Sequence, residues 1–322
     1  MGRSQGPSAP TAARATERCS RCGVVLEPVL ELAERGMAVL VMITGAGGRI
    51  GAAASAAVAA AGHEVRALVR EEDAPGVPGG VGEVVLGDVT DPAAVLRAVH
   101  GADAVVHLGA IPAPRGEPIE VFSNNVVGTF TVLDLAARSG VRRLIHASSL
   151  SALGLAWADG ARSPDYVPVD EEHPLRPEEC YGLSKQVDEQ TGAMVARRYG
   201  CTVLAYRFPF TATAAAIAAR AALVADDPTE GSRELWAYLD VRDAASALLA
   251  GVERRIEAGF HAINVVMADT LSPLTSTELV ARFHPRAEVR SALSGRAPLF
   301  STERAEHLLG FRAAWQRGVP GA

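Results

Sequence analysis

The sequence has few cysteines, no long block of one charge sign and no uninterrupted apolar run of membrane length. Its 4 cysteines are too few and too scattered for a disulfide framework, so reduced thiols are expected. The 31 basic and 37 acidic residues are dispersed along the chain and give no electrostatic footprint for a nucleic acid. A small-molecule partner is therefore the better expectation.

The most apolar stretch, residues 38–61, is interrupted by glycines and by Arg49. A membrane helix needs about 20 predominantly apolar residues, so this stretch is a poor fit. Residues 1–21 are rich in Ser, Ala, Pro and Arg and lack the apolar segment of a signal peptide. These absences predict a cytoplasmic protein without a membrane partner.

Residues 1–37 are compositionally distinct and are expected to form a disordered tail. Cys19 and Cys22 within it have the spacing of half a zinc site. Four-coordinate zinc needs two more ligands and no second pair follows, so no metal is expected.

From residue 38 onward, short apolar runs alternate with helical stretches, the pattern of a parallel sheet covered by helices on both faces. With 322 residues and 48% hydrophobic content, the chain can bury a large core. No fixed-period repeat is present, which argues against a solenoid. The predicted strands are 39–44, 64–69, 83–86, 104–107, 143–147 and 202–207, and the predicted helices are 48–61, one capped by Asp91 with Pro92 in its first turn, 121–139 and 178–199.

A glycine-rich turn, residues 44–51, joins the first predicted strand to the first predicted helix. Gly45 permits a tight reversal, Gly48 lets the main chain approach a pyrophosphate, and Gly51 allows the helix to pack closely on the sheet. Phosphates would meet the free N–H groups at the helix start. Many strand-to-helix turns are glycine-rich for packing alone, but the position at this junction favours a dinucleotide site.

The Gly-x-x-Gly-x-x-Gly spacing of this turn resembles the extended short-chain dehydrogenase/reductases, the NAD-dependent epimerase/dehydratase family. Residues 87–90, 106–110 and 125–129 resemble further motifs of that family, in its order. The resemblance implies a doubly wound, Rossmann-type α/β sheet with a small C-terminal substrate-binding part, and an NAD(P) cofactor. The residues that it implies for cofactor binding are Gly45, Gly48, Arg49, Ile50, Gly51, Arg70, Asp88, Val89, Leu108, Gly109, Ala110, Asn125, Lys185 and Phe208.

Several of these positions also have ordinary structural interpretations. Asp88, whose family counterpart accepts from the adenine amine, could cap a turn, and His107 could be a core histidine. Asn125, whose counterpart supports the active-site backbone, could be a buried structural amide. The joint order of the motifs makes coincidence improbable.

The choice between NAD and NADP depends on the end of the second strand. There an acidic residue holds the ribose 2′-hydroxyl in NAD enzymes, and by alignment that position is Val69. Arg70 follows directly and Arg49 lies in the glycine turn, so two guanidiniums could face a 2′-phosphate. Both could instead be solvated surface charges. The pattern favours NADP.

Tyr181 and Lys185 lie four residues apart at the start of a predicted helix, hence on one face. A phenol titrates near pH 10, and a nearby ammonium favours the phenolate. Tyr181 would then move a hydroxyl proton while hydride passes to or from nicotinamide, and Lys185 would also hold the cofactor ribose. The family's third member is a Ser or Thr after strand five. Counting back from Gly154 selects Ser149, with Ser148 as the fallback.

The resemblance also bears on domains, reaction and assembly. Residues 38–207 and 236–266 are expected to form the dinucleotide-binding domain, and 208–235 with 267–322 the small substrate-binding part. The run from Ser149 to Lys185, residues 238–243 and the compact C-terminus together look most like uronate dehydrogenases. This resemblance favours oxidation of an alcohol or lactol, or carbonyl reduction, on a small sugar-like compound. The alternatives are a sugar-nucleotide 4-epimerase or dehydratase with tightly bound NAD, and a non-catalytic dinucleotide sensor. The family implies a possible homodimer.

Overall fold

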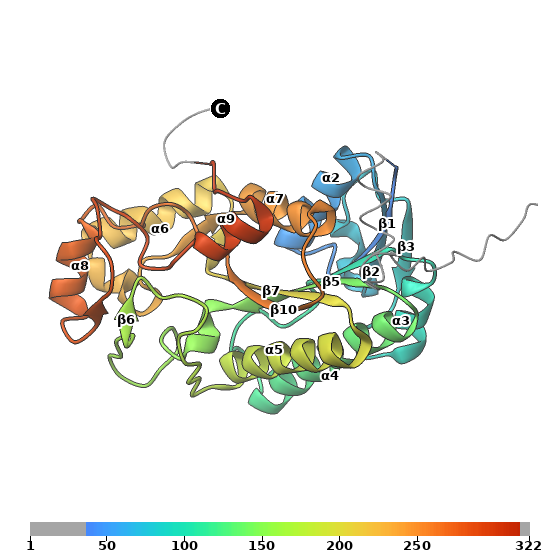
Figure 1. Cartoon of the computed structure of the whole chain (residues 1–322), viewed down its shortest axis with the longest axis horizontal. Helices are drawn as coiled ribbons and strands as arrows, with labels where there is room; N and C mark the ends of the chain where they lie inside the picture. Colours follow the sequence, from blue (N-terminus) through green and yellow to red (C-terminus); the bar gives the residue numbers. More distant parts are fainter. Residues whose placement is uncertain (1–36, 316–322) are drawn as a thin grey trace, which may run out of the picture.

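Seven parallel strands form the central sheet of the computed structural model, which describes residues 37–315 (Figure 1). Their order is β3-β2-β1-β4-β5-β7-β10, which confirms the doubly wound α/β class. The order reverses between β1 and β4, and ligands of such sheets bind at the carboxyl ends of the strands beside that point. The strands are β1 (Leu40–Thr44), β2 (Glu64–Val69), β3 (Glu83–Leu86), β4 (Ala104–His107), β5 (Arg143–Ser149), β7 (Thr202–Phe208) and β10 (Gly259–Asn264).

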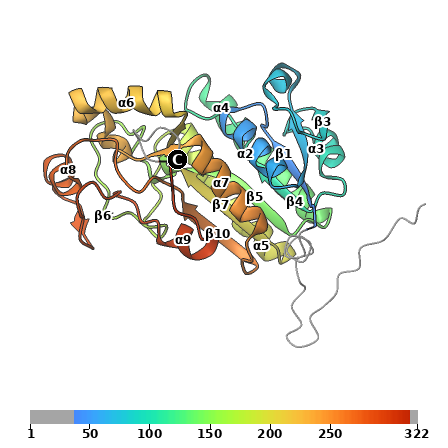
Figure 2. The same ribbon diagram turned by 90° about the horizontal axis from the view of Figure 1, so that it is seen from above.

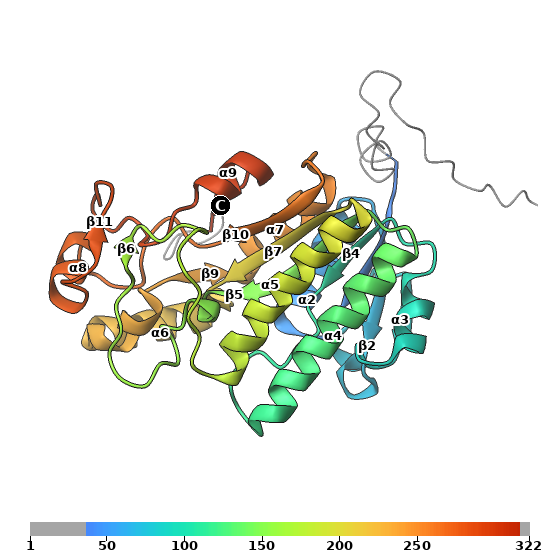
Figure 3. The same cartoon turned by 60° about the horizontal axis from the view of Figure 1, so that its bottom comes forward.

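Helices cover both faces of the sheet. On one face α2 (Arg49–Ala60) packs against α7 (Val241–Glu253), and both lie over the central strands in Figure 2. On the other face α4 (Pro118–Arg138) packs against α5 (Cys180–Tyr199) and α3 (Pro92–Val99) (Figure 3). Buried hydrophobic side chains form one core on each side of the sheet.

Smaller elements complete the described chain. β8 (Phe210–Ala212) follows β7 directly and η2 (Leu150–Leu153) follows β5, so both lie at the carboxyl edge of the sheet. β8 pairs with β9 (Tyr238–Asp240), and β6 (Tyr166–Val167) pairs with β11 (Glu288–Val289). The other elements are η1 (Glu71–Gly76), α6 (Ala214–Asp226), η3 (Pro228–Glu234), α8 (Ser276–Phe283) and α9 (Glu303–Leu309).

The predicted elements agree with the structure except at their ends. Asp91 caps α3, accepting a hydrogen bond from Ala93 N, with Pro92 in the first turn as predicted. α4 begins at Pro118 instead of 121, because a proline at the first helical position loses no helical hydrogen bond. β5 and β7 continue to Ser149 and Phe208.

Among residues 37–315, no helix is both long and apolar enough to cross a membrane. The predicted disordered tail, with Cys19 and Cys22, lies outside the described residues apart from Met37.

Candidate active site

The glycine turn between β1 and α2 has the shape of a phosphate cradle. Gly45 has a φ of 66°, and a Cβ there would lie 2.9 Å from Gly109 N. A Cβ on Gly51 would lie 2.0 Å from Gly45 O, so only glycine allows α2 to start this close to the turn. α2 begins after Gly48 with no side-chain cap and no acidic residue in its first turn. Its first N–H groups and positive dipole end therefore fit a dinucleotide pyrophosphate.

The motifs after β3 and β4 pack against each other beside this turn. A Cβ on Gly109 would lie 2.9 Å from one Val89 methyl, and a Cβ on Gly128 would lie 2.7 Å from the other. Asp88 Oδ1 accepts hydrogen bonds from Thr90 N at 2.8 Å and Thr90 Oγ1 at 2.6 Å. Asp88 thus caps the turn after β3, in agreement with the structural role considered from the sequence. It also lies at the same edge of the sheet as the glycine turn.

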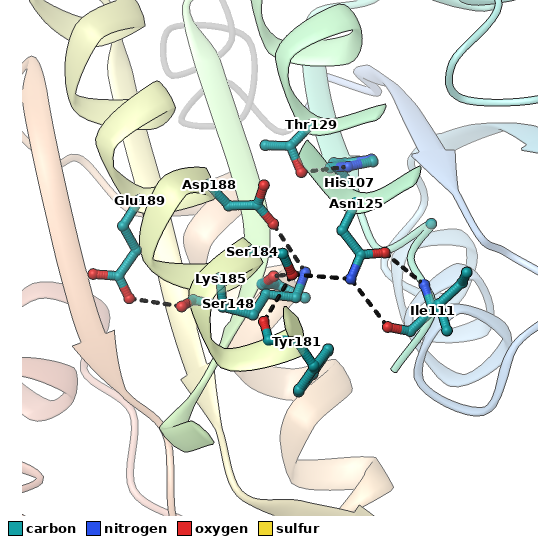
Figure 4. Close-up of polar contacts among 12 residues, drawn as sticks. His107, Ile111, Asn125, Thr129, Ser148, Tyr181, Ser184, Lys185, Asp188 and Glu189 are labelled. Atoms are coloured by element: carbon teal, nitrogen blue, oxygen red, sulfur yellow. Dashed lines mark hydrogen bonds and ion pairs between the residues drawn. The ribbon is translucent and has the colours of Figure 1, made fainter. Parts of the chain in front are cut away.

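Asn125 on α4 ties the loop after β4 to α5. Its Oδ1 accepts from Ile111 N at 2.8 Å, and its Nδ2 donates to Ile111 O at 3.1 Å (Figure 4). The same Nδ2 donates to Ser184 Oγ at 3.1 Å, and Ser184 Oγ donates to Tyr181 O at 2.7 Å. One buried amide therefore links the loop after β4 to the first turn of α5, where Tyr181 lies.

Tyr181 and Lys185 lie on one face at the start of α5. Glu179 caps the helix, because its carboxylate accepts from Tyr181 N at 2.6 Å and Gly182 N at 2.7 Å. Lys185 Nζ is 5.9 Å from the centre of the Tyr181 ring, and both side chains are buried. A Cβ on Gly182 would lie 2.7 Å from Ser151 O, so this end of α5 sits directly on the segment that follows Ser149.

Lys185 is the only lysine in the sequence, and arginine supplies every other one of the 31 basic residues. Arginine is always charged and presents a rigid fork, whereas lysine is a point charge whose pKa responds to its surroundings. Lysine occurs at a single position, in the first turns of the helix that begins beside Tyr181. This compositional signal points to Lys185 without any motif.

Lys185 Nζ has two fixed partners: it donates to Asp188 Oδ2 and to Ala147 O, each at 3.1 Å. Burial lowers the pKa of Lys185, but the Asp188 carboxylate and Tyr181 raise it by more, so the ammonium stays charged. Asp188 is not among the site residues predicted from the sequence. The available signal was an acid three residues after the lysine on a predicted helix, a spacing that brings side chains together.

The serines after β5 have separate partners. Ser149 Oγ accepts from Ser151 N at 3.1 Å, which leaves the hydroxyl hydrogen of Ser149 able to donate. Ser148 Oγ donates to Glu189 Oε1 at 2.6 Å and so points to the opposite face of the strand. Glu189 in turn holds Arg207 through two hydrogen bonds of 2.8 Å. The fallback Ser148 thus belongs to this buried ion pair.

Phe208, Ile50 and Ala110 lie close to the carboxyl ends of the strands, Phe208 paired in register with Ser149. Of the two arginines expected near a 2′-phosphate, Arg49 donates to Thr211 O at 2.8 Å and so joins the glycine turn to β8. Arg70 pairs with Asp73 at 2.9 Å and Glu72 at 3.1 Å.

Comparison with known proteins decides the family. The family model for the NAD dependent epimerase/dehydratase family matches residues 41–266. The chain belongs to this family. Relatives named as NAD(P)- or NAD-dependent dehydrogenases support an oxidoreductase within it.

An L-arabinose 1-dehydrogenase (NAD(P)(+)) from Haloferax volcanii is 29% identical over 76% of this chain and 96% of its own length. A uronate dehydrogenase from Pseudomonas syringae pv. tomato is 33% identical over 52% of this chain and 57% of its length. Among solved structures, a short-chain dehydrogenase/reductase superfamily protein from Agrobacterium tumefaciens with bound NAD is 25% identical, with a TM-score of 0.64 over 86% of this chain and 93% of its own. A UDP-galactose 4-epimerase gives 27% identity and a TM-score of 0.62 over 86% and 94% of the two chains.

Proposed function

We propose that this chain catalyses the reversible oxidation of a hydroxyl group, in an alcohol or lactol, of a small sugar-like substrate. The observation that carries the proposal is the placement of Tyr181, Lys185 and Ser149 at the same sheet edge as the glycine turn. The names of the relatives, which include dehydrogenases of arabinose, uronate and glucose-6-phosphate, support a sugar as the substrate class.

When bound at the strand ends, a nicotinamide dinucleotide would supply the hydride acceptor for the carbon that carries the hydroxyl. Tyr181, as phenolate, takes the hydroxyl proton, and it returns that proton in the reverse reaction. The Lys185 ammonium, 5.9 Å from the centre of the Tyr181 ring, stabilises the negative charge on the tyrosine oxygen during the proton transfer. Ser149 donates its hydroxyl hydrogen to the substrate oxygen and thereby orients it.

The cofactor would be held by the residues of the strand ends, and we propose a preference for NADP. Val69 supplies no carboxylate for a ribose 2′-hydroxyl, and Arg70 follows it with a side chain that is 55% exposed. The ion pairs of Arg70 with Asp73 and Glu72 are solvent-exposed and therefore weak, so a doubly charged 2′-phosphate can displace them. Comparing kcat/KM for NADP and NAD tests this: Arg70→Ala should lower the NADP value alone.

Substrate recognition is assigned to residues 208–235 and 267–322, with 38–207 and 236–266 holding the dinucleotide. We further propose a homodimer through the outer face of α4 and α5. Ile119, Val127 and Phe130 on α4 are exposed apolar side chains, as is Leu183 on α5. Large apolar side chains gathered on one face mark interaction surfaces.

The decisive experiment is a screen of aldoses and uronates with NAD or NADP, and of small ketones with the reduced cofactors, following the rise or fall in absorbance of the reduced nicotinamide. Net reduction of cofactor with a free sugar supports the proposal. A UDP-glucose 4-epimerase from Streptomyces lividans is 28% identical over 80% of this chain and 85% of its length, which makes epimerisation the second candidate. An epimerase would convert a nucleotide sugar without net reduction, and that result would overturn the dehydrogenase assignment.

A further inference from the structure

Asp188 is a buried carboxylate that the proposed reaction does not use, and it lies beside the only lysine. Its side chain is 0% exposed and that of Lys185 is 4% exposed, with 3.1 Å between Oδ2 and Nζ. Removing a charge from water is costly unless it is paired and hydrogen-bonded. The buried ion pair at the proposed catalytic lysine therefore stabilises the charged form of that lysine.

Behind Asp188 a series of buried hydrogen bonds runs back to β1. Thr44 Oγ1 accepts from Leu108 N and Gly109 N, each at 3.0 Å, and it lies 2.8 Å from His107 Nδ1. His107 Nε2 lies 3.2 Å from Thr129 Oγ1, and Thr129 lies beside Asp188 (Figure 4).

The direction of each hydrogen bond in this series follows from the number of protons available. Both lone pairs of Thr44 Oγ1 are used by backbone N–H groups, so its one hydrogen donates to His107 Nδ1. Burial and the Lys185 charge lower the pKa of His107 to about 3, so the ring is neutral and carries its proton on Nε2. Nε2–H then donates to Thr129 Oγ1, whose own hydrogen is free to face Asp188.

Every donor in the series thus points toward Asp188, and the series ends at backbone amides that do not release protons. Such a series cannot carry a proton out to solvent, but it can stabilise a negative charge on Asp188. Burial raises the pKa of Asp188, while Lys185 and the Thr129 hydroxyl offset part of that rise.

We propose that Asp188 is a positioning residue for the reaction: it keeps the Lys185 ammonium charged and tethered, and Thr44, His107 and Thr129 hold Asp188 in turn. Asp188 and Ala147 O take two of the three ammonium hydrogens. The third remains for the cofactor ribose and the Tyr181 side. The inference rests on the proposed function, because it gives Lys185 a reaction to serve.

The charged and titratable groups around Lys185 come from three elements. Asp188, Glu189 and Tyr181 lie on α5 with it, and each raises its pKa. His107 on β4 and His146 on β5 face it as neutral rings, because burial, with a contribution from Lys185, lowers the pKa of both. Removing the Asp188 charge leaves burial as the main influence, which lowers the pKa of Lys185.

The direct test is a titration of Lys185 by NMR in protein labelled with 13C only at lysine, where a single lysine gives a single signal. In the wild-type protein the midpoint should lie above the ordinary 10.5, and in Asp188→Asn below it. Thr129→Val, which removes one donor without changing the side-chain volume much, should move it in the same direction by less. This measurement needs no substrate, so it separates failure of the inference from failure of the proposed function.

Activity gives the second readout. In Asp188→Asn, kcat for oxidation should fall about tenfold or more at alkaline pH, because neutral Lys185 no longer favours the Tyr181 phenolate, and recover as pH falls. Asp134→Asn is the matched control, since Asp134 also links α4 to α5, through Tyr199 Oη at 2.7 Å. Its pH profile should match the wild type. An unchanged Lys185 midpoint in both Asp188→Asn and Thr129→Val, or in Thr129→Val alone if Asp188→Asn does not fold, would overturn the proposal.

Discussion

Asp188 and Glu189 are adjacent on α5, each holds one buried basic side chain, and the two ion pairs are built differently. Glu189 binds Arg207 through two hydrogen bonds of 2.8 Å, accepts from Ser148, and leaves Arg207 to donate also to Glu171 O. Asp188 makes one contact of 3.1 Å with Lys185. A bidentate ion pair with arginine fixes the relative position of two elements. An ion pair with lysine instead stabilises the charged ammonium and leaves one of its hydrogens able to donate elsewhere.

The same division occurs on β5, where neighbouring residues point to opposite faces of the sheet. Ser148 belongs to the Glu189–Arg207 pair, and Ser149 lies at the strand end with its hydroxyl hydrogen unused by Ser151. Ser148 therefore belongs to the ion pair that stabilises the fold, whereas Ser149 is left for the proposed reaction. Substitutions at neighbouring positions should separate stability from activity.

The largest effect is expected for Tyr181→Phe, on the reaction side. Losing the acid/base group should lower kcat by about 10²–10⁴-fold, the usual contribution of a positioned proton donor or acceptor. Thermal unfolding and dinucleotide binding, measured by the cofactor-induced rise in melting temperature, serve as controls and should stay near wild type. Turnover at the wild-type rate would remove Tyr181 from the mechanism.

Next in size is Glu189→Gln, on the stability side. The change keeps the shape but leaves Arg207 as an uncompensated buried charge, which should cost about 3–5 kcal/mol in the free energy of unfolding. Chemical denaturation measures it, with the exposed Glu257→Gln as the control. At neutral pH, where Asp188 still keeps Lys185 charged, the rate per folded molecule should stay close to wild type. A large loss of rate with intact stability would place Glu189 in the reaction instead.

These two pairs also show how far the sequence alone could go. The glycine turn was predictable because Gly45, Gly48 and Gly51 act within one short segment, and the strands and helices followed from periodicity. The series of hydrogen bonds from Thr44 to Asp188, behind Lys185, was not predictable. Thr44 and His107 are 63 residues apart, and only the register of the sheet brings them together. The spacing from Lys185 could have suggested Asp188, but an acid three residues from a lysine usually forms an ion pair on the protein surface. Only the burial seen in the structure distinguishes Asp188 from such a surface pair.

A smaller effect is expected for Ser149→Ala. Losing one donor to the substrate oxygen should lower kcat/KM by about 10²-fold, at the lower end for removal of a preorganised donor. The free energy of unfolding should hardly change, because the Ser149 side chain makes its one described contact with Ser151 N at the end of the strand. Steady-state kinetics and denaturation on the same preparation test both halves. Full activity in Ser149→Ala would leave substrate orientation to another group.

The smallest effect is expected for Ser148→Ala, one residue earlier. Ser148 donates a buried hydrogen bond of 2.6 Å to Glu189, and its loss should lower the free energy of unfolding by about 1 kcal/mol. Arg207 still donates to both oxygens of the Glu189 carboxylate, so the ion pair remains and kcat/KM should not change. The comparison with Ser149→Ala is direct, since the same hydroxyl is removed from opposite faces of one strand. If Ser148→Ala lost activity and Ser149→Ala lost stability, the assignment of the two faces would be reversed.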